Sequence, residues 1–599
     1  MPSPVHYRII PADPGAHLFE VTLTVSRPAP AGQRLSLPAW IPGSYMIREF
    51  ARNIVRISAT CRGRAVALTK VDKHTWDAAP CDGPLAITYQ VYAWDLSVRS
   101  AHLDETHGFF NGTSVFLRVH GQDEGPHTVE IARPRGRTYA AWRVASALPR
   151  SPGTGAGAFG LYHAGSYDEL IDHPVELGTF THVAFRACGV PHEVAITGRQ
   201  DCDTRRLAAD LKKICEAQIR FFHGAKAGAR DVPFDRYVFL VMAVGDGYGG
   251  LEHRASTALI CARDALPYAG MKGRPEAYVG FLGLCSHEYF HNWNVKRIKP
   301  AAFAPYDLTR ENHTRLLWAF EGFTSYYDDL FLRRAGLIDT KTYLGLVAKT
   351  AQGVLRGSGR HKQSVGDASF DAWIKFYRQD ENAPNALVNY YTKGSLVALG
   401  LDLLLRVRTR GTRSLDDVMR RLWREYGAGF ERTGTGVPED GLRRAVLATA
   451  PGARRALSAY IDAAVDGTAD LPLAALLRQV GVLLKVESGT HPALGARVAA
   501  APGGIKLTHV LDGGGAQAAG LSAGDVIIAL DGLRASTDAL EAMLARKRVG
   551  ATVAVHAFRR DELIERDVVL CAAELKVSAT RMSHASTPAD RLARSWLGE

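Results

Sequence analysis

The first 185 residues alternate between apolar and polar positions in short runs. The runs 19–25 and 85–92 place apolar side chains at every second position, the pattern of a strand with one buried face. Pro, Gly and Asp interrupt these runs at short intervals, which is typical of turns between strands. The pattern predicts a β-rich, sandwich-like N-terminal domain over residues 1–185.

Helical spacing replaces this alternation in the middle of the chain. Asp203 and Thr204 are cap candidates for a helix that continues to Phe222. The apolar run 237–242 predicts a buried strand, and helical patterns dominate from about residue 280 to 470. The apolar segment 394–405 is too short and too interrupted for a membrane span, so we expect a buried helix there.

Short strands and glycine turns return between about residues 490 and 572. The segment 520–532 passes from a small-residue turn into an apolar strand, and Asp531-Gly532 fits a tight hairpin. This segment resembles the G-L-x-x-G-D-x-I-x-x-[IL]-[ND]-G pattern of PDZ domains. The polar tail after about residue 575 is expected to fray. The expected fold class is therefore a multidomain α+β protein.

Composition narrows the class of protein. A net charge of +12 spread over 599 residues, with only short basic clusters such as Arg546-Lys547-Arg548, does not predict a nucleic-acid partner. No signal peptide is evident at the N-terminus, and no run of 18 apolar residues predicts a membrane segment. The eight cysteines form no C-x-x-C pair, which favours free thiols in a reducing compartment. We expect a cytoplasmic protein.

The segment His287-Glu288-Tyr289-Phe290-His291 carries the most specific chemistry. Two histidines four residues apart lie on one helix face and can bind a single Zn²⁺. Glu288 can then take a proton from a water held at the open metal position. This H-E-x-x-H pattern is typical of zinc peptidases. A five-residue motif with only three fixed positions also occurs by chance, so the assignment of a zinc site needs support from the surrounding sequence.

A hydrolytic zinc needs a third protein ligand. Glu321, within Trp318-Ala319-Phe320-Glu321-Gly322, follows His291 by 30 residues and is the best candidate. Asp328, two helical turns further on, could accept a hydrogen bond from the far nitrogen of a zinc-bound histidine. Glu311 is a competing ligand, 20 residues after His291.

Three motifs resemble those of the aminopeptidase N and leukotriene hydrolase clan. Glu-Gly-Phe-Thr-Ser-Tyr at 321–326 is similar to N-E-G-F-A-x-Y, whose Glu is the third zinc ligand. Gly249-Gly250-Leu251-Glu252-His253 resembles G-[AG]-M-E-N, whose Glu binds the free amino terminus of the substrate. Tyr391-Thr392-Lys393-Gly394 looks like Y-x-K-G, whose Tyr supports the tetrahedral intermediate. The resemblance implies these roles for Glu321, Glu252 and Tyr391, with Gly249 and Gly250 beside the substrate.

Two departures from the clan leave alternatives open. The gap between His291 and Glu321 is longer than the 18-residue insertion usual there, so an extra loop is expected. His253 replaces the clan's Asn and could hydrogen-bond a substrate carbonyl or be only a neighbour of Glu252. Tyr390 is interpreted as a packing residue, since Tyr391 matches the motif register.

The whole chain resembles the glycyl aminopeptidase family more closely. The resemblance adds P-A-W-I-P-G-S-Y at 38–45 and H-E-Y-F-H-N-W-N-V-K-R-I at 287–298 to the motifs above. It implies removal of small N-terminal residues, glycine and alanine, with one Zn²⁺ per chain. It also implies this organisation: a β-rich domain at 1–185, a thermolysin-like catalytic domain at 186–335, a helical domain at 336–485, a PDZ domain at 486–575 and a tail at 576–599.

The sequence leaves alternatives open for the substrate pocket, the partners and the function. The loop 38–45 is either a structural turn or a wall of the substrate cleft. Tyr248, Tyr289 and Phe290 could narrow a first-residue pocket or belong to the core. The expected partners are peptides with a free N-terminus and, at the PDZ domain, a C-terminal peptide, for which the loop near Leu494-Gly495 is the candidate carboxylate site. Two alternative functions are a PDZ-guided zinc endopeptidase and a non-catalytic PDZ interaction protein on a peptidase scaffold.

Overall fold

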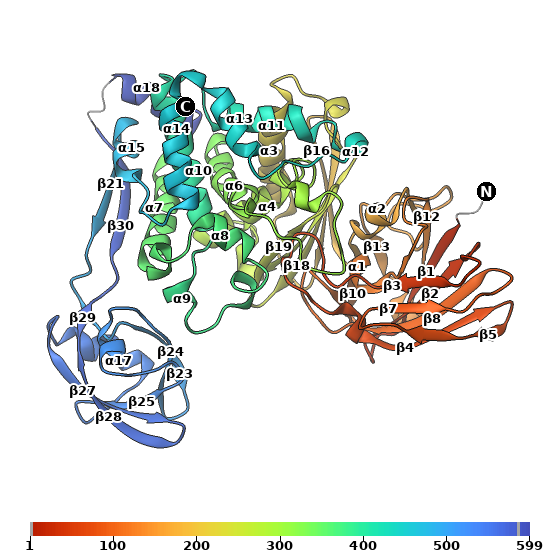
Figure 1. The fold of residues 1–599 in the computed structure, drawn as a ribbon, viewed down its shortest axis with the longest axis horizontal. Helices are drawn as coiled ribbons and strands as arrows, with labels where there is room; N and C mark the ends of the chain where they lie inside the picture. Colours follow the sequence, from red (N-terminus) through yellow and green to blue (C-terminus); the bar gives the residue numbers. More distant parts are fainter. Residues whose placement is uncertain (1–3, 584–586) are drawn as a thin grey trace. The chain divides into compact units, whose positions relative to one another are not determined.

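The computed structural model describes residues 4–583 and 587–599 of the chain (Figure 1). The chain forms two compact units. The first comprises Met1–Asn312, Arg334–Ile338 and Leu422–Pro438, and the second comprises His313–Arg333, Asp339–Arg421 and Glu439–Glu599.

The N-terminal part of the first unit is built from three sheets. A seven-stranded sheet has the order β14 (Gly160–Ala164), β12 (His127–Ile131), β1 (Val5–Asp13), β2 (Leu18–Val25), β8 (Leu85–Tyr92), β4 (Ile54–Cys61), β5 (Arg64–Val66). One four-stranded sheet has the order β11 (Arg118–Val119), β3 (Gln33–Ser36), β7 (Thr75–Ala78), β6 (Leu68–Lys70). The other has the order β13 (Arg143–Ala145), β15 (Val175–Gly178), β10 (His107–Phe110), β9 (Ala101–Leu103). Apolar side chains alternate inward on β2 and β8, which confirms the predicted β-rich domain.

A five-stranded sheet with two long helices follows in the first unit. Its order is β16 (Thr181–Ala187), β17 (Val190–Thr197), β18 (Tyr237–Val244), β20 (Ser256–Ala262), β19 (Tyr248–Glu252). β18 is parallel to both β17 and β20 and almost wholly buried, as the apolar run predicted. The helix α3 (Thr204–His223) begins at Asp203, whose side chain accepts a hydrogen bond from the Arg206 N–H. It packs against α4 (Glu276–Phe290), which also contacts β19 and β20.

The second unit begins with helices. The main ones are α5 (Leu317–Phe320), α6 (Gly322–Arg334), α7 (Thr340–Arg356), α8 (Val365–Phe370), α9 (Ala383–Ala386), α10 (Thr392–Arg408), α11 (Leu415–Leu422), α13 (Gly441–Thr449), α14 (Arg454–Ile461) and α15 (Leu473–Gln479). α10 is buried on all sides from Lys393 to Arg406, which confirms the expected buried helix. Among the helices of the described chain, none has both the length and the apolarity needed to cross a bilayer.

The sheet that contains the PDZ-like segment 520–532 follows the helices, at the blue end of Figure 1. Its order is β23 (Ala496–Ala501), β24 (Gly504–Val510), β25 (Val526–Leu530), β27 (Thr552–Arg559), β28 (Glu562–Val569), with β26 (Leu533–Arg534) beside β25. Two helices, α16 (Gly515–Ala518) and α17 (Thr537–Ala545), accompany it. Asp531 and Gly532, both with positive φ, turn β25 into β26 as predicted.

The expected frayed tail was wrong. The strand β30 (Lys576–Arg581) pairs with β21 (Val482–Glu487), and β29 (Cys571–Ala572) pairs with β22 (Pro492–Ala493). The segments before and after this sheet in the chain therefore pair with each other. The last helix, α18 (Thr587–Leu597), buries Trp596 completely, and its indole N–H donates to the Tyr326 hydroxyl at 3.0 Å. The apolar side chains of α18 recur at helical spacing, and burying that face offsets the entropy of ordering the chain end.

Candidate active site

The helix α4 carries His287 and Glu288 and ends at His291. Most of its residues are buried, and His291 occupies the C-cap, where its N–H donates to the His287 carbonyl oxygen. The two Nε2 atoms lie 3.1 Å apart and the rings are 83° apart. Two imidazole nitrogens that converge on one point fit a shared metal ion, because tetrahedral zinc with bonds of about 2.0–2.1 Å separates its ligand atoms by about this distance.

His291 is held in one orientation by the turn that follows α4. Its Nδ1 donates to the carbonyl oxygen of Asn294 at 2.7 Å, and the Lys296 N–H donates to the His291 carbonyl oxygen. A proton fixed on Nδ1 leaves Nε2 as the atom that can bind a metal. The Asn294 carbonyl oxygen is therefore the partner of the far ring nitrogen of His291.

Glu252 is the last residue of the edge strand β19, which contacts the helix α4. One ligand atom each from Glu252, Glu288 and His291 lie within 4.8 Å of one another. Glu252 is only 4% exposed. Among the described residues, none forms a hydrogen bond or an ion pair with its carboxylate. A buried carboxylate without a cationic partner is costly, and a ligand that brings an ammonium group would supply that partner.

Gly250 lies in direct contact with Glu288. A Cβ built on Gly250 would meet Oε1 of Glu288 at 2.1 Å, so only glycine allows this approach. Its carbonyl oxygen accepts a hydrogen bond from Nη2 of Arg99 at 3.2 Å. A Cβ on Gly249, in contrast, would meet Ile260 at 3.6 Å, an ordinary contact distance. The two glycines of the motif are thus not equivalent.

The loop 38–45 is both a turn and a wall beside Glu252. Gly43 has φ +93°, and an added Cβ would lie 2.5 Å from Oε2 of Glu252 and 2.6 Å from the Leu251 side chain. The indole N–H of Trp40 anchors the loop by donating to the Asp307 carbonyl oxygen at 2.8 Å. The backbone of Gly43 therefore closes one side of the Glu252 carboxylate.

Two aromatic residues of α4 that could have narrowed the pocket belong to the core. Tyr289 is fully buried, and its hydroxyl lies 2.9 Å from Nε2 of His192. Phe290 is also fully buried and packs on Phe222. Tyr248 is exposed.

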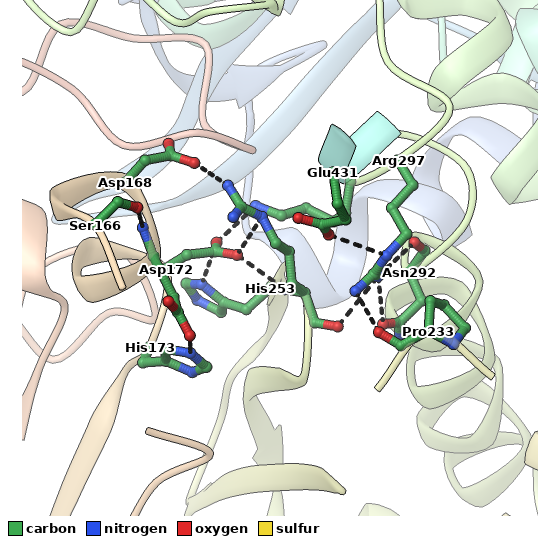
Figure 2. A network of polar contacts seen from close by, with 12 residues as sticks. Ser166, Asp168, Asp172, His173, Pro233, His253, Asn292, Arg297 and Glu431 are labelled. Atoms are coloured by element: carbon green, nitrogen blue, oxygen red, sulfur yellow. Dashed lines mark hydrogen bonds and ion pairs between the residues drawn. The ribbon is translucent and has the colours of Figure 1, made fainter. Parts of the chain in front are cut away.

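A buried polar network, shown in Figure 2, holds the chain immediately after Glu252. Asp172 accepts hydrogen bonds from Nδ1 of His253 at 3.2 Å, from the Arg254 backbone N–H at 3.0 Å and from Nζ of Lys296 at 2.7 Å. Arg254 also pairs with Asp168. Burial alone would raise the pKa of Asp172, but the Lys296 ammonium and the His253 hydrogen bond hold it well below the usual value. His253 thus has one ring nitrogen engaged by the network.

Asp172 connects the two halves of the site. His253 and Arg254 follow Glu252 directly, and Lys296 belongs to the turn that holds His291. Sequence analysis missed Asp172 and Lys296, although Lys296 lies inside the motif at 287–298. Their pairing over 124 positions leaves no local pattern that could have revealed it.

Glu321 and Tyr391 belong to the second unit, on adjoining elements. Glu321 is buried at the C-cap of α5, and its N–H donates to the Leu317 carbonyl oxygen at 2.7 Å. A Cβ on Gly322 would meet the backbone of Gly394 at 2.6 Å. The glycines of the two motifs therefore let α6 and α10 touch, and this contact sets Glu321 relative to Tyr391.

Tyr391 forms the N-cap of α10 within a group of aromatic rings. Its hydroxyl lies 3.2 Å from the Tyr377 hydroxyl, and its N–H donates to Oδ1 of Asn389 at 2.8 Å. The Tyr390 ring stacks on it at 4.8 Å. Tyr390 is fully buried, and its hydroxyl has no hydrogen-bond partner among the described residues.

The H-E-x-x-H helix, the two glycines and the buried Glu252 define a metallopeptidase. Three family models match successive parts of the chain: the Peptidase M61 N-terminal domain at residues 6–179, M61 glycyl aminopeptidase at 280–397 and a PDZ domain at 492–570. The chain belongs to the M61 glycyl aminopeptidase family and is a metallo-aminopeptidase.

One solved structure agrees with this family and with the multidomain α+β fold over nearly the whole chain. An aminopeptidase N family protein from Idiomarina loihiensis is 40% identical, with a TM-score of 0.92 over 99% of this chain and 100% of that chain. An M1 zinc metallopeptidase from Deinococcus radiodurans is 13% identical, with a TM-score of 0.49 over 78% of this chain and 94% of that chain. No curated protein matches the chain.

Proposed function

We propose that this enzyme removes a small N-terminal residue, glycine or alanine, from peptides and uses one catalytic Zn²⁺ per chain. The observation that carries this proposal is the buried Glu252 carboxylate, which has no hydrogen-bond or ion-pair partner in the described part of the chain and lies beside Glu288 and His291. A fixed carboxylate at that point selects substrates with a free α-ammonium group and positions their first peptide bond.

The metal ligands in this proposal are His287, His291 and Glu321. Two neutral imidazoles and one carboxylate are the donor set of hydrolytic zinc sites, which keep a further position open. Zinc bound there would supply a Lewis acid for water and for the scissile carbonyl. Asp328 is proposed to accept a hydrogen bond from the far nitrogen of a zinc-bound histidine.

The protein side chains divide the remaining work. Glu288 takes the proton of the attacking water and passes it to the leaving amine. Glu252 pairs with the substrate ammonium, and Tyr391 donates a hydrogen bond to the developing oxyanion. Gly250 gives Glu288 the room it occupies, and Gly249 lines the same strand.

The preference for small first residues is supported by the surroundings of Glu252. The Gly43 backbone lies so close to its carboxylate that an added Cβ would be 2.5 Å from Oε2, so an ammonium paired there brings its own side chain close to this loop. Bulk is rejected sterically, whereas glycine and alanine are separated by only about 1–3 kcal/mol.

The test is release of a chromophore from glycyl-, alanyl-, leucyl- and N-acetylglycyl-anilides, with Glu288→Gln as control. We expect rapid cleavage of the glycyl and alanyl substrates only, abolished by the substitution. Equal cleavage of the acetylated substrate would remove Glu252 as an essential anchor and favour the endopeptidase. No turnover of any anilide or of longer peptides by zinc-loaded protein would favour a non-catalytic scaffold.

A C-terminal peptide is the proposed ligand of the PDZ domain. In the described sheet β23 is an edge strand that pairs only with β24, and it contacts α17. An extended peptide can add to such an edge, with its carboxylate near Leu494-Gly495.

A further inference from the structure

A hairpin of the N-terminal domain brings two buried histidines and an aspartate together. β9 and β10 pair in antiparallel register, with His102 opposite Phe109, and Asp104 opens the turn between them. One ligand atom each from His102, Asp104 and His107 lie within 4.8 Å of one another. None of these residues takes part in the proposed catalytic chemistry.

Asp104 is oriented as a ligand by the turn itself. Its Oδ1 accepts hydrogen bonds from the Thr106 N–H at 2.6 Å, the Thr106 hydroxyl at 2.6 Å and the His107 N–H at 3.0 Å. Its Oδ2 has no donor from the turn and lies 3.3 Å from Nε2 of His102. Such a division, one oxygen held by the protein and one left for a cation, is common among metal-binding carboxylates.

In the described chain, one of the two histidines, His102, lacks a partner that a buried imidazole normally has, whereas Nδ1 of His107 lies 3.2 Å from the Thr106 hydroxyl. His102 and His107 are 4% and 3% exposed, and their rings stack at 4.7 Å. Nδ1 of His102 has no hydrogen-bond partner among the described residues, and its other nitrogen has only the 3.3 Å contact with Asp104. A buried polar atom without a partner carries a cost that a bound ligand can relieve.

Space and access are also present. His102, His107 and Glu176, but not Asp104, line a cavity of about 30 Å³ whose other walls are mainly apolar, enough for one ion or a water molecule. Asp104 retains 27% of its side-chain exposure, so solvent reaches the turn.

We propose that His102, Asp104 and His107 form a second metal site, separate from the catalytic one, for a divalent transition metal such as Zn²⁺. Two imidazoles and a carboxylate match the ligand preferences of Zn²⁺, Ni²⁺ and Cu²⁺ and disfavour Mg²⁺ or Ca²⁺. The site pins the hairpin two residues after Arg99, which donates to the Gly250 carbonyl oxygen. Metal binding would therefore stiffen the segment that supports the strand of Glu252.

The test counts metal per chain by elemental mass spectrometry, after chelator treatment, reloading with Zn²⁺ and gel filtration. We expect about two Zn²⁺ per chain for the wild type, one for His102→Gln/His107→Gln, and two for the matched control His163→Gln/His182→Gln, which alters exposed histidines of the same unit. An equal count for the wild type and the hairpin variant would overturn the proposal. A loss of one metal in the hairpin variant while His287→Gln/His291→Gln loses none would uphold it and reject the catalytic site instead.

Asp104→Asn guards against misfolding of the double variant. Its side-chain oxygen keeps the hydrogen bonds of the turn while the charge is removed. We expect unchanged thermal unfolding of the metal-free protein and at least a tenfold weaker Zn²⁺ affinity at one of the two sites. Unchanged affinity at both sites would contradict the assignment.

Discussion

Gly250 lies so close to Glu288 that a single methyl group would occupy the position of the carboxylate, 2.1 Å from Oε1. Gly250→Ala should push the Glu288 carboxylate out of its position. We expect kcat to fall by about 100-fold, because misplacing a catalytic group by about 1 Å lowers the rate by about that factor. Gly249→Ala is the matched control, because its Cβ would meet Ile260 at an ordinary 3.6 Å, and it should retain activity within a few-fold. Equal losses in the two variants would show that the Gly250 contact does not position the base.

Asp172 is expected to act as a positioning residue for Glu252. Asp172→Asn leaves the buried Lys296 without its counterion and loosens the chain after Glu252. We expect KM for a glycyl-anilide to rise more than kcat falls, and unfolding by denaturant to become easier by about 3–5 kcal/mol.

Asp168→Asn provides the comparison for Asp172→Asn. Asp168 also pairs with Arg254, but its side chain is 54% exposed, so its loss should cost about 1 kcal/mol or less. Removing both partners, in Asp172→Asn/Lys296→Met, should recover part of the stability. If the double variant is no more stable than Asp172→Asn, the ion pair is not what holds the network.

The tandem tyrosines are expected to separate by function. Tyr391→Phe should lower kcat by about 100- to 1,000-fold with KM little changed, as for the loss of one oxyanion donor. Tyr390→Phe should retain activity and stability, because the Tyr390 hydroxyl has no hydrogen-bond partner among the described residues. Steady-state kinetics on the glycyl substrate decide the matter. The reverse ranking would assign the oxyanion role to Tyr390.

Local patterns predicted the parts of the site that lie close together in sequence. The spacing of His287 and His291 places both rings on one helix face whatever surrounds the helix, and their Nε2 atoms do converge. The buried strand β18 and the cap at Asp203 followed from periodicity and side-chain chemistry in the same way.

Contacts between distant segments could not be predicted. Arg99 reaches Gly250 across 151 positions, and Asp172 reaches Lys296 across 124. Such contacts depend on how one domain packs on another, and no periodic pattern of apolar and polar residues in the sequence reveals them. The last helix was missed for a different reason, because the polar residues of α18 conceal an apolar face that buries Trp596.

Lys299 should make stability rise with pH above neutrality. Its ammonium lies 4.2 Å from the centre of the Tyr306 ring and 4.8 Å from that of Phe430. Burial, with the Arg254 charge nearby, lowers the pKa of Lys299 to about 7. An unfolded chain keeps this proton up to about pH 10.4, so between these values the unfolded state binds the extra proton and stability increases with pH, by up to about 1.4 kcal/mol per unit.

The measurement for Lys299 is urea unfolding at pH 6, 7, 8 and 9. Lys299→Met removes the titrating group and keeps an apolar side chain of similar length. The slope of unfolding free energy against pH above pH 7 should therefore fall by up to about 1.4 kcal/mol per pH unit, the contribution of one proton. The stabilising effect of the substitution should be largest at pH 6, where the buried lysine is charged in the native protein. Lys296→Met is a poor control because it leaves Asp172 unpaired, whereas the exposed Lys272, changed to Met, should leave the pH dependence as it is. An identical pH dependence in the wild type and Lys299→Met would mean that Lys299 keeps its proton in the native state throughout this range.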